Sequence, residues 1–325
     1  MMVLPFALWG TAMAAMKPLL ADAPPFSLAA LRVLPAGAVL LLVLPLLGRN
    51  WRVARSDWSW LLLFSLIDAT LFQGLLVQGL GSTGAGLGSV LIDSQPLLVA
   101  LLARTLYGEA INPFGWFGLL LGLAGILCLG LPAPLLQHWW LDGPEAISTD
   151  LFSHGELWML AAAAAMAVGT VLCRQASRSS DPVAVTGWHL LLGGLPLALS
   201  AALGPVLDPT AAPAWPTWGP GGWVLMAYAS LLGSALAYGL FFWFANAGDL
   251  TAFTSLTFLT PVFALLCAMA LLEERLGALQ WLGVVLALIS VLLINRRHQL
   301  WNAPLRSDPP LPAPLVPPTP ARGLP

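Results

Sequence analysis

The chain has 325 residues, of which 58% are hydrophobic and 9% are charged, and its formal net charge is −2. A soluble domain carries about 25% charged residues, so this composition excludes an ordinary soluble protein, and the near-neutral charge predicts no nucleic-acid partner. The apolar residues fall in blocks of about twenty, which matches the thickness of a bilayer. A membrane β-barrel would instead show alternating segments of about ten residues. The sequence therefore predicts an all-α polytopic membrane protein.

Ten membrane spans are predicted in chain order, at residues 2–19, 28–47, 58–79, 84–104, 112–131, 157–173, 183–203, 221–243, 250–271 and 277–295. No basic segment precedes the first apolar run, so we interpret it as a retained helix and not as a signal peptide. Residues 132–156, after the fifth span, form a loop that is acidic and lacks Lys and Arg. The Pro-rich tail at residues 297–325 is predicted to be disordered.

The three cysteines, Cys128, Cys173 and Cys267, lie inside predicted spans. An odd number of cysteines at membrane depth argues against a disulfide framework and favours free thiols. The Cys and His residues show no spacing typical of metal ligands. We therefore expect neither a metal ion nor another cofactor.

An internal repeat relates the two halves of the chain. A shift of 165 positions aligns identical residues without a gap, namely Gly74 with Gly239, Pro96 with Pro261, Glu109 with Glu274, Trp116 with Trp281 and Gly118 with Gly283. A shift of 157 positions aligns earlier residues, namely Lys17 with Arg174, Pro25 with Pro182 and Gly37 with Gly194. The sequence thus predicts two five-helix repeats, at residues 1–131 and 157–296, joined by the external acidic loop at residues 132–156.

Tandem repeats of five helices must cross the membrane in opposite senses, because five is odd. The arginines give an independent test, since positive residues favour the cytoplasmic side. If both termini are cytoplasmic, this side receives Arg49, Arg52, Arg55, Arg104, Arg174, Arg178, Arg296 and Arg297, with Arg275 as an exception. Such inverted repeats are typical of secondary transporters, which hold substrate near the midplane between them. We expect the protein in the bacterial cell (inner) membrane.

Short motifs in a fixed order resemble the EamA family of the drug/metabolite transporter superfamily. They are Leu8-Trp9-Gly10 with Lys17, Ala30-Leu31-Arg32, and the two segments from Pro96 to Glu109 and from Pro261 to Glu274. The stretches Trp9 to Met13, Ile92 to Pro96 and Thr186 to His189 are similar to the cyanobacterial and plastid branch. The resemblance covers residues 2–296. It implies a ten-helix permease that moves small organic metabolites, often outward, and it does not supply the substrate.

Two carboxylates, Asp68 and Asp93, fall in the middle of the third and fourth spans. A charge at the bilayer centre costs a few kcal/mol or more, so such residues usually face a bundle interior or a water-filled cavity. We predict that at least one of them contacts a substrate amine or takes up a proton during transport. The alternatives are a structural ion pair, for instance with Arg32, and a neutral acid that is hydrogen-bonded to a helix backbone. The aligned residues Gly233 and Phe258 indicate that the fold does not require these acids.

Arg32 aligns with His189, and both lie within the first two turns of their predicted spans. Arg32 is a candidate for binding a substrate carboxylate or for pairing with Asp93, and His189 is a candidate proton carrier. The alternative is that either side chain extends toward a membrane interface. Trp9 and Trp188 are candidates for lining a pocket, although packing accounts for most aromatic side chains at helical spacing.

Pro96 and Pro261 are predicted to lie in the middle of helices, where each removes a backbone hydrogen bond and acts as a hinge. Gln95 is assigned to the substrate or coupling site, with interhelical hydrogen bonding as the alternative. Glu109 and Glu274 lie at the ends of spans, where we predict gating or capping roles.

The leading functional prediction is a secondary transporter, an exporter of a small metabolite such as an amino acid, with proton coupling as an option. Its partners would be the small-molecule substrate, membrane lipids and protons. One alternative is a receptor or assembly factor that transports nothing. Another is an intramembrane aspartyl protease with Asp68 and Asp93 as a dyad.

Overall fold

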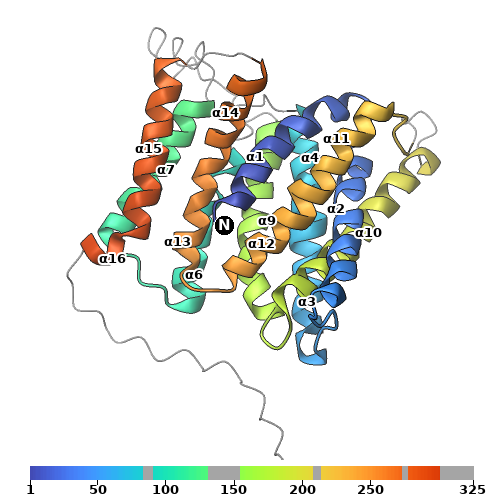
Figure 1. Cartoon of the computed structure of the whole chain (residues 1–325), viewed down its shortest axis with the longest axis horizontal. Coiled ribbons are helices and arrows are strands. Elements are labelled where there is room, and N and C mark those ends of the chain that lie inside the picture. Colours follow the sequence, from blue (N-terminus) through green and yellow to red (C-terminus); the bar gives the residue numbers. More distant parts are fainter. Residues whose placement is uncertain (83–90, 131–153, 208–213, 273–276, 301–325) are drawn as a thin grey trace, which may run out of the picture.

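The computed structural model of the chain describes residues 1–82, 91–130, 154–207, 214–272 and 277–300, and in these ranges every regular element is a helix (Figure 1). The α-helices are α1 (Leu4–Met16), α2 (Pro25–Leu46), α3 (Trp58–Phe64), α4 (Gln73–Ser82), α6 (Gln95–Tyr107), α7 (Pro113–Gly130), α9 (His154–Ala176), α10 (Pro182–Leu207), α11 (Pro220–Ser230), α12 (Ala237–Ala245), α13 (Leu250–Thr254), α14 (Thr260–Leu272), α15 (Ala278–Asn295) and α16 (Arg297–Leu300). Three segments are 3₁₀-helical, η1 (Lys17–Ala21), η2 (Arg55–Asp57) and η7 (Ser255–Leu259), and two are π-helical, η3 (Ser65–Phe72) and η6 (Leu231–Leu236).

The protein is an integral membrane protein, because its helices are long and apolar enough to cross a bilayer. Among the described residues, 8 helices meet this criterion by length and composition. They correspond to eight of the ten predicted spans. Of the other two, Pro113–Leu129 is apolar but shorter, and α6 follows residues 83–90, which are not described. The ten-span count therefore remains a prediction.

Two of the long spans carry a π-helical segment in their middle. In the span Arg55–Ser82 this segment is η3, between α3 and α4, and in the span Pro220–Ala245 it is η6, between α11 and α12. π-helical turns are rare and frequently occur at functional sites. The two segments thus mark the parts of these spans where a functional site is to be sought.

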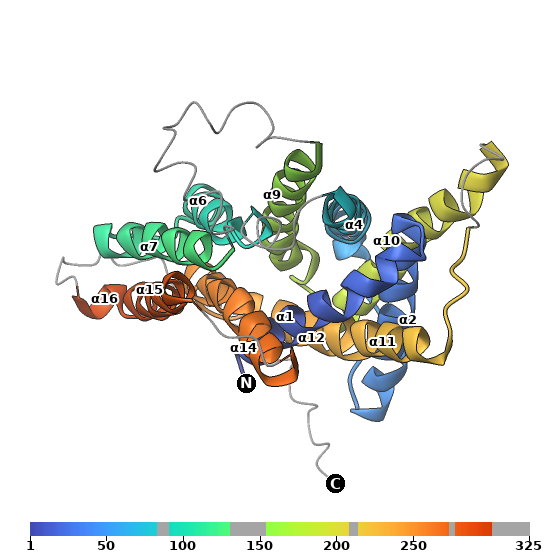
Figure 2. The same ribbon diagram turned by 90° about the horizontal axis from the view of Figure 1, so that it is seen from above.

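Seen from above, the helices form two facing rows with a helix pair at each end (Figure 2). One row contains α6, α9 and α4, and the other contains α14, α1 and the rod of α11 and α12. The end pairs are α7 with α15 and α2 with α10, and each pair packs along its length. This arrangement leaves the inner faces of the two rows opposite one another in the centre of the molecule.

Glycines allow the helices of each end pair to approach closely. A Cβ atom on Gly37 of α2 would lie 2.7 Å from the Gly187 carbonyl oxygen of α10. In the other pair, a Cβ atom on Gly283 of α15 would lie 2.7 Å from the Gly125 carbonyl oxygen of α7. Since a real Cβ atom does not approach a backbone oxygen so closely, only glycine permits these contacts.

The tail prediction needs a correction at its start. Arg297–Leu300 form the short helix α16, so these residues are ordered. The Arg297 side chain is buried, and its guanidinium pairs with Asp249. The backbone carbonyl oxygen of Arg297 accepts a hydrogen bond from Asn112 Nδ2 at 2.6 Å. These contacts hold the chain after α15 against the bundle. Residues 301–325 lie outside the described residues, as does most of the loop predicted at 132–156, of which 154–156 belong to α9.

Candidate functional site

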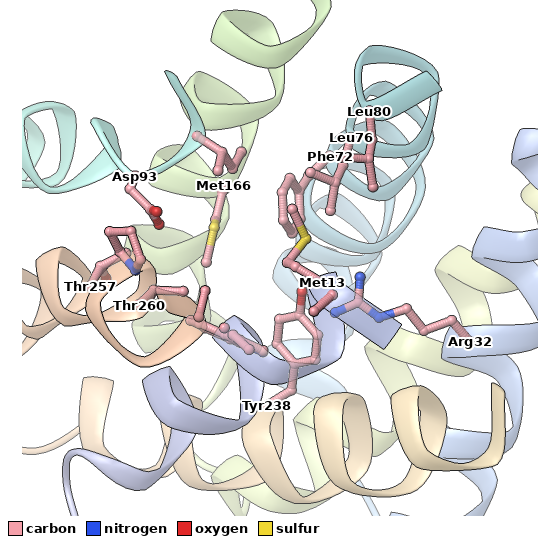
Figure 3. Close-up of a pocket in the computed structure, with 16 residues that line it drawn as sticks. Met13, Arg32, Phe72, Leu76, Leu80, Asp93, Met166, Tyr238, Thr257 and Thr260 are labelled. Carbon is pink, nitrogen blue, oxygen red and sulfur yellow. The ribbon is translucent and has the colours of Figure 1, made fainter. Parts of the chain in front are cut away.

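A cavity of about 370 Å³ lies between the two rows of helices (Figure 3). Most of its wall is apolar, with contributions from α1, η3, α4, α9 and α14. The side chains that line it are Trp9, Met13, Ala14, Arg32, Phe72, Leu76, Leu80, Ile92, Asp93, Met166, Tyr238, Thr257, Thr260, Pro261 and Ala264, together with Gly10. Of the predicted site residues, the cavity therefore brings together Trp9, Arg32, Asp93 and Pro261.

Two interrupted helices place polar groups at this cavity. The turn at Asp93 and Ser94 separates the helical residues Leu91 and Ile92 from α6, and the 3₁₀ segment η7 separates α13 from α14. Asp93 lies in the first interruption and Thr257 lies in the second. Irregular backbone at membrane depth is tolerated where it lines a cavity, which is its position here.

The prediction that Pro96 and Pro261 lie in the middle of helices is wrong. Each is the second residue of a new helix, because α6 begins at Gln95 and α14 begins at Thr260. Proline is favoured in the first helical turn, since its missing N–H would have no intrahelical acceptor there. The two prolines begin helices after an interruption and break no helical hydrogen bond. A hinge role for them stays a prediction.

Arg32 supplies a positive charge at one side of the cavity. Its side chain is buried, so it does not extend toward a membrane interface. Arg32 Nε donates to Ser234 Oγ at 2.8 Å, and one terminal nitrogen donates to Gln73 Oε1 at 3.3 Å. Gln73 in turn donates to the Tyr238 hydroxyl at 2.7 Å. Asp93 lies across the cavity from this network, so the two opposite charges face one space from different sides (Figure 3).

Three residues that line the cavity each have a buried polar side-chain atom without a hydrogen-bond partner among the described residues. These atoms are Trp9 Nε1, Thr257 Oγ1 and Thr260 Oγ1. The Trp9 ring is held by Phe241 and Tyr238, with ring centroids at 4.8 and 5.1 Å. An unsatisfied buried polar group costs about 1–3 kcal/mol, so these three atoms, which are covered by neighbouring groups in this structure, are a costly feature of the residues around the cavity.

Asp68 and His189 form a separate pair that does not line this cavity. Both side chains are fully buried, and His189 Nε2 lies 3.0 Å from Asp68 Oδ2. His189 Nδ1 lies 2.7 Å from the Thr186 carbonyl oxygen. Asp93 is thus apart from Asp68, and the two acids do not form a protease-like dyad.

Gln95 and Trp188 contact protein groups outside the cavity lining. Gln95 Nε2 donates to Thr170 Oγ1 at 3.0 Å, which joins α6 to α9. Trp188 Nε1 donates to the Trp51 carbonyl oxygen at 2.9 Å, and the two indole rings are stacked at 6.0 Å. Of the two alternatives for Trp188, pocket lining and packing, these contacts support packing, beside the chain that follows α2.

Glu109 caps the helix α13. Its carboxylate accepts hydrogen bonds from the backbone N–H groups of Leu250 and Thr251, at 2.9 and 3.1 Å, and from the Thr251 hydroxyl at 2.8 Å. Arg174 lies 3.6 Å from the same carboxylate. Of the two predicted roles, gating and capping, the structure supports capping. Glu274 lies outside the described residues.

Comparison with known proteins identifies the family. The model of the EamA-like transporter family matches residues 1–131 and 153–296. The chain belongs to this family. It is accordingly a transporter-family protein and not an enzyme, which excludes the protease alternative.

Relatives of this EamA-like protein include a cyanobacterial and a plastid protein. An uncharacterized transporter of Synechocystis sp. is 51% identical over 308 residues, which cover 92% of this chain and 90% of that protein. A chloroplastic WAT1-related protein of Arabidopsis thaliana is 42% identical over 90% of this chain and 68% of its own length. The Escherichia coli inner membrane transporter YedA is 25% identical over 92% of this chain and 90% of its own. The predicted resemblance to cyanobacterial and plastid proteins is confirmed.

The fold also occurs in a solved crystal structure. That chain superposes with a TM-score of 0.71 at 21% identity, over 91% of this chain and 96% of the other. The superposition shows that the two chains share a fold. The low sequence identity carries no information on what the EamA-like protein transports.

Several residues of the cavity and of the Arg32 network were not predicted from the sequence, among them Tyr238, Met166 and Ser234. Tyr238 and Met166 line the cavity, and Ser234 accepts from Arg32. A hydroxyl inside an apolar span was a usable signal for Ser234 and Tyr238, since such groups seek partners within the bundle. Met166 lies in an alanine-rich span and carried no such signal.

Proposed function

We propose that this protein is a secondary transporter that carries a small zwitterion with an apolar body, such as an aliphatic amino acid, through the cavity between the two rows. The observation that carries the proposal is the charge arrangement, with Arg32 and Asp93 facing one apolar space from different sides. A carboxylate is suited to the guanidinium and an ammonium group to the aspartate, and the apolar wall suits a hydrocarbon side chain.

The proposed architecture is ten spans in two inverted five-helix repeats. Matching boundaries support it, because α7 (Pro113–Gly130) and α15 (Ala278–Asn295) have the same 18-residue length at a shift of 165 positions. Reciprocal contacts support it as well, since Cβ atoms on Gly37 and Gly194, aligned by the shift of 157, would contact the aligned side chains of Leu191 and Leu34. Each row would then be the counterpart of the other, and the site would lie between repeats, as in transporters that alternate access about a midplane site.

The proposed orientation has both termini in the cytoplasm of a bacterial inner membrane, with residues 132–156 outside. A reporter fusion tests it. Alkaline phosphatase inserted within residues 132–156 should be active, and the same enzyme fused after Leu300 should be inactive. Activity in the reverse pattern contradicts the proposed orientation.

Transport of a named probe tests the function. Purified protein in liposomes should exchange internal and external radiolabelled L-leucine without any ion gradient, and an imposed proton gradient should drive its accumulation. Leucinamide lacks the carboxylate and 4-methylpentanoate lacks the ammonium group, so each should compete about ten-fold less well than L-leucine, the loss expected for one charge-assisted contact. Absence of exchange with L-leucine and with the other protein amino acids contradicts the amino-acid proposal.

A further inference from the structure

Two buried contacts join α2 and α10 to the π-helical segments. His189 of α10 contacts Asp68 of η3, and Arg32 of α2 donates to Ser234 of η6. His189 and Arg32 are aligned by the shift of 157 positions, and Ser234 is the residue after the counterpart of Asp68 at the shift of 165. In each contact a basic side chain of one proposed repeat thus reaches the π-helical segment of the other repeat. One contact is always charged, and the other contains two groups that titrate.

The hydrogen-bond geometry determines how many protons the pair of Asp68 and His189 holds. His189 Nδ1 must carry a hydrogen, because its neighbour at 2.7 Å is the Thr186 carbonyl oxygen, which only accepts. His189 Nε2 faces Asp68 Oδ2 at 3.0 Å, so a second proton must lie between these two atoms. If that proton leaves, the lone pair of a neutral imidazole faces a carboxylate, and the contact becomes repulsive.

The surroundings leave this pair without another strong counter-charge. The His189 ring is stacked on Phe64 at 4.1 Å and meets Phe242 edge-on at 5.3 Å. Asp68 Oδ1 is buried and has no hydrogen-bond partner among the described residues, and Gly169 of α9 lies directly against it. An ionised Asp68 that has lost its proton partner would therefore be a nearly uncompensated buried charge.

The other titratable groups near the pair, within the described ranges, lie on α9, α12 and α2. Cys173 of α9 and Tyr238 of α12 are within electrostatic range of Asp68, and both are neutral groups at physiological pH. Arg32 of α2 is charged but is held by Ser234 and Gln73. The protonation of the pair is therefore governed by Asp68 and His189 themselves.

We propose that Asp68 and His189 form a proton-binding latch between the two halves, closed while one proton bridges His189 Nε2 and Asp68 Oδ2 and open when that proton is released. The proton comes from water on one side of the membrane and is returned to water on the other. The proposal rests on the proposed transport function, and it names the coupling site as distinct from the substrate cavity. Asp93, which lines the cavity, then serves the substrate.

A mechanical link connects the latch to the cavity. The segment η3 carries Asp68 toward α10, and it also carries Phe72, which lines the cavity. A second, non-titratable bond joins the same two elements, from the Thr70 hydroxyl to the Gly193 carbonyl oxygen at 2.7 Å. Opening the latch frees η3 at Asp68, so that the wall at Phe72 can move.

The protonation test needs no substrate. Protein in lipid nanodiscs, labelled with ¹⁵N-histidine, contains 4 histidines, and the His189→Gln variant identifies the His189 signals by difference. Across a pH series in which the protein stays folded, release of the bridging proton should change the Nε2 signal of His189 from protonated to unprotonated while Nδ1 keeps its hydrogen. In Asp68→Asn the neutral imidazole with hydrogen on Nδ1 should persist throughout. A wild-type signal that stays constant, or an Asp68→Asn titration equal to the wild type, overturns the latch.

Transport then separates the latch from the function itself. With L-leucine as the probe, Asp68→Asn and His189→Gln should lose proton-driven accumulation by about ten-fold or more while exchange without a gradient continues. Thr70→Val removes the neighbouring bond between η3 and α10 without removing a titratable group, so it should keep the proton dependence. Retained accumulation in both latch variants overturns the coupling role. If the wild type exchanges no L-leucine, the proposed substrate fails, and the nanodisc titration still decides the latch.

Discussion

At the scale of single residues, the cavity concentrates polar atoms that the protein leaves unsatisfied. Trp9 Nε1 and the hydroxyls of Thr257 and Thr260 lack partners among the described residues, although each lies in a well-packed wall. A core selected only for stability would replace them with apolar groups of the same shape, because burying an unpaired polar atom is unfavourable. A ligand that completes their hydrogen bonds would account for them, provided that the covering groups move when it binds.

Substitution of Thr257 tests this explanation. Valine has the shape of threonine without its hydroxyl. Thr257→Val should therefore increase the free energy of unfolding of the empty protein by up to ~1 kcal/mol and raise its thermal unfolding midpoint. The same variant should bind L-leucine several-fold more weakly. Thermal unfolding in one detergent, with and without L-leucine, measures both effects. Thr105→Val, on an exposed face of α6, is the control and should leave binding unchanged. A Thr257→Val protein that binds as tightly as the wild type contradicts a ligand role for this hydroxyl.

A second prediction concerns Arg32, because its guanidinium makes several contacts at once. It bonds Ser234 and Gln73 while presenting its charge to the cavity, and lysine lacks the planar fork for this geometry. Arg32→Lys should therefore weaken L-leucine binding by about ten-fold, although the charge is kept. Ser234→Ala, which removes one of these bonds and leaves the guanidinium in place, should have a smaller effect. Equal binding by Arg32→Lys and the wild type would show that the fork is dispensable.

At the scale of elements, interruptions of the helices carry the polar side chains of the proposed sites. The break before α6 carries Asp93, the break before α14 carries Thr257, and the π-helical segment η3 carries Asp68. Each break costs helical hydrogen bonds, so it must be stabilised from outside. For the second break, Glu109 supplies part of this stabilisation by capping α13, the short helix that precedes η7.

Removal of the cap should loosen the second interruption. Glu109→Ala leaves two backbone N–H groups of α13 without acceptors and should lower stability by ~2 kcal/mol, because a charged cap is lost. Glu109→Gln keeps one acceptor oxygen and should cost less. The thermal unfolding midpoint measures the order, which should be wild type above Glu109→Gln above Glu109→Ala. If Glu109→Ala has the same thermal unfolding midpoint as the wild type, the capping role is wrong.

At the scale of the whole molecule, two tight helix pairs enclose two facing rows. The pairs α2 with α10 and α7 with α15 meet through glycines at backbone contact, whereas the rows between them face a cavity. The proposed alternating access would require firm contacts at the ends and room in the centre, so that one row can move against the other. The distribution of glycines and cavity matches that requirement.

The closeness of α2 and α10 gives a stability prediction. Gly37→Ala places a methyl group against the Gly187 carbonyl oxygen, and forcing the helices apart should cost ~1–3 kcal/mol. Gly204→Ala is a matched control on α10, where an added Cβ atom meets nothing within 4 Å. It should be neutral or slightly stabilising, since alanine favours the helix. Equal unfolding midpoints for the two variants would contradict a tight pivot at Gly37.

Part of the site could be predicted from the sequence. The apolar blocks gave the membrane class, the repeat singled out Arg32 and His189 as counterparts, and Asp68 and Asp93 stood out because charges at membrane depth are costly. The role of Trp188 could not be decided, because an indole at helical spacing has the same pattern whether it lines a pocket or packs against Trp51. Pro96 and Pro261 were misplaced within their helices, because a proline in an apolar run does not show where the helix begins.

The sequence by itself determined what kind of molecule this is, because hydropathy, repeats and charge bias are properties of the chain read along its length. Only the tertiary structure decided that Asp68 pairs with His189, across 121 positions of the chain, while Asp93 faces the cavity with Arg32. The two acids look alike in sequence, since each follows Leu-Ile in a span. Their different roles depend on which helix lies opposite each carboxylate, and that is fixed by packing between the two halves.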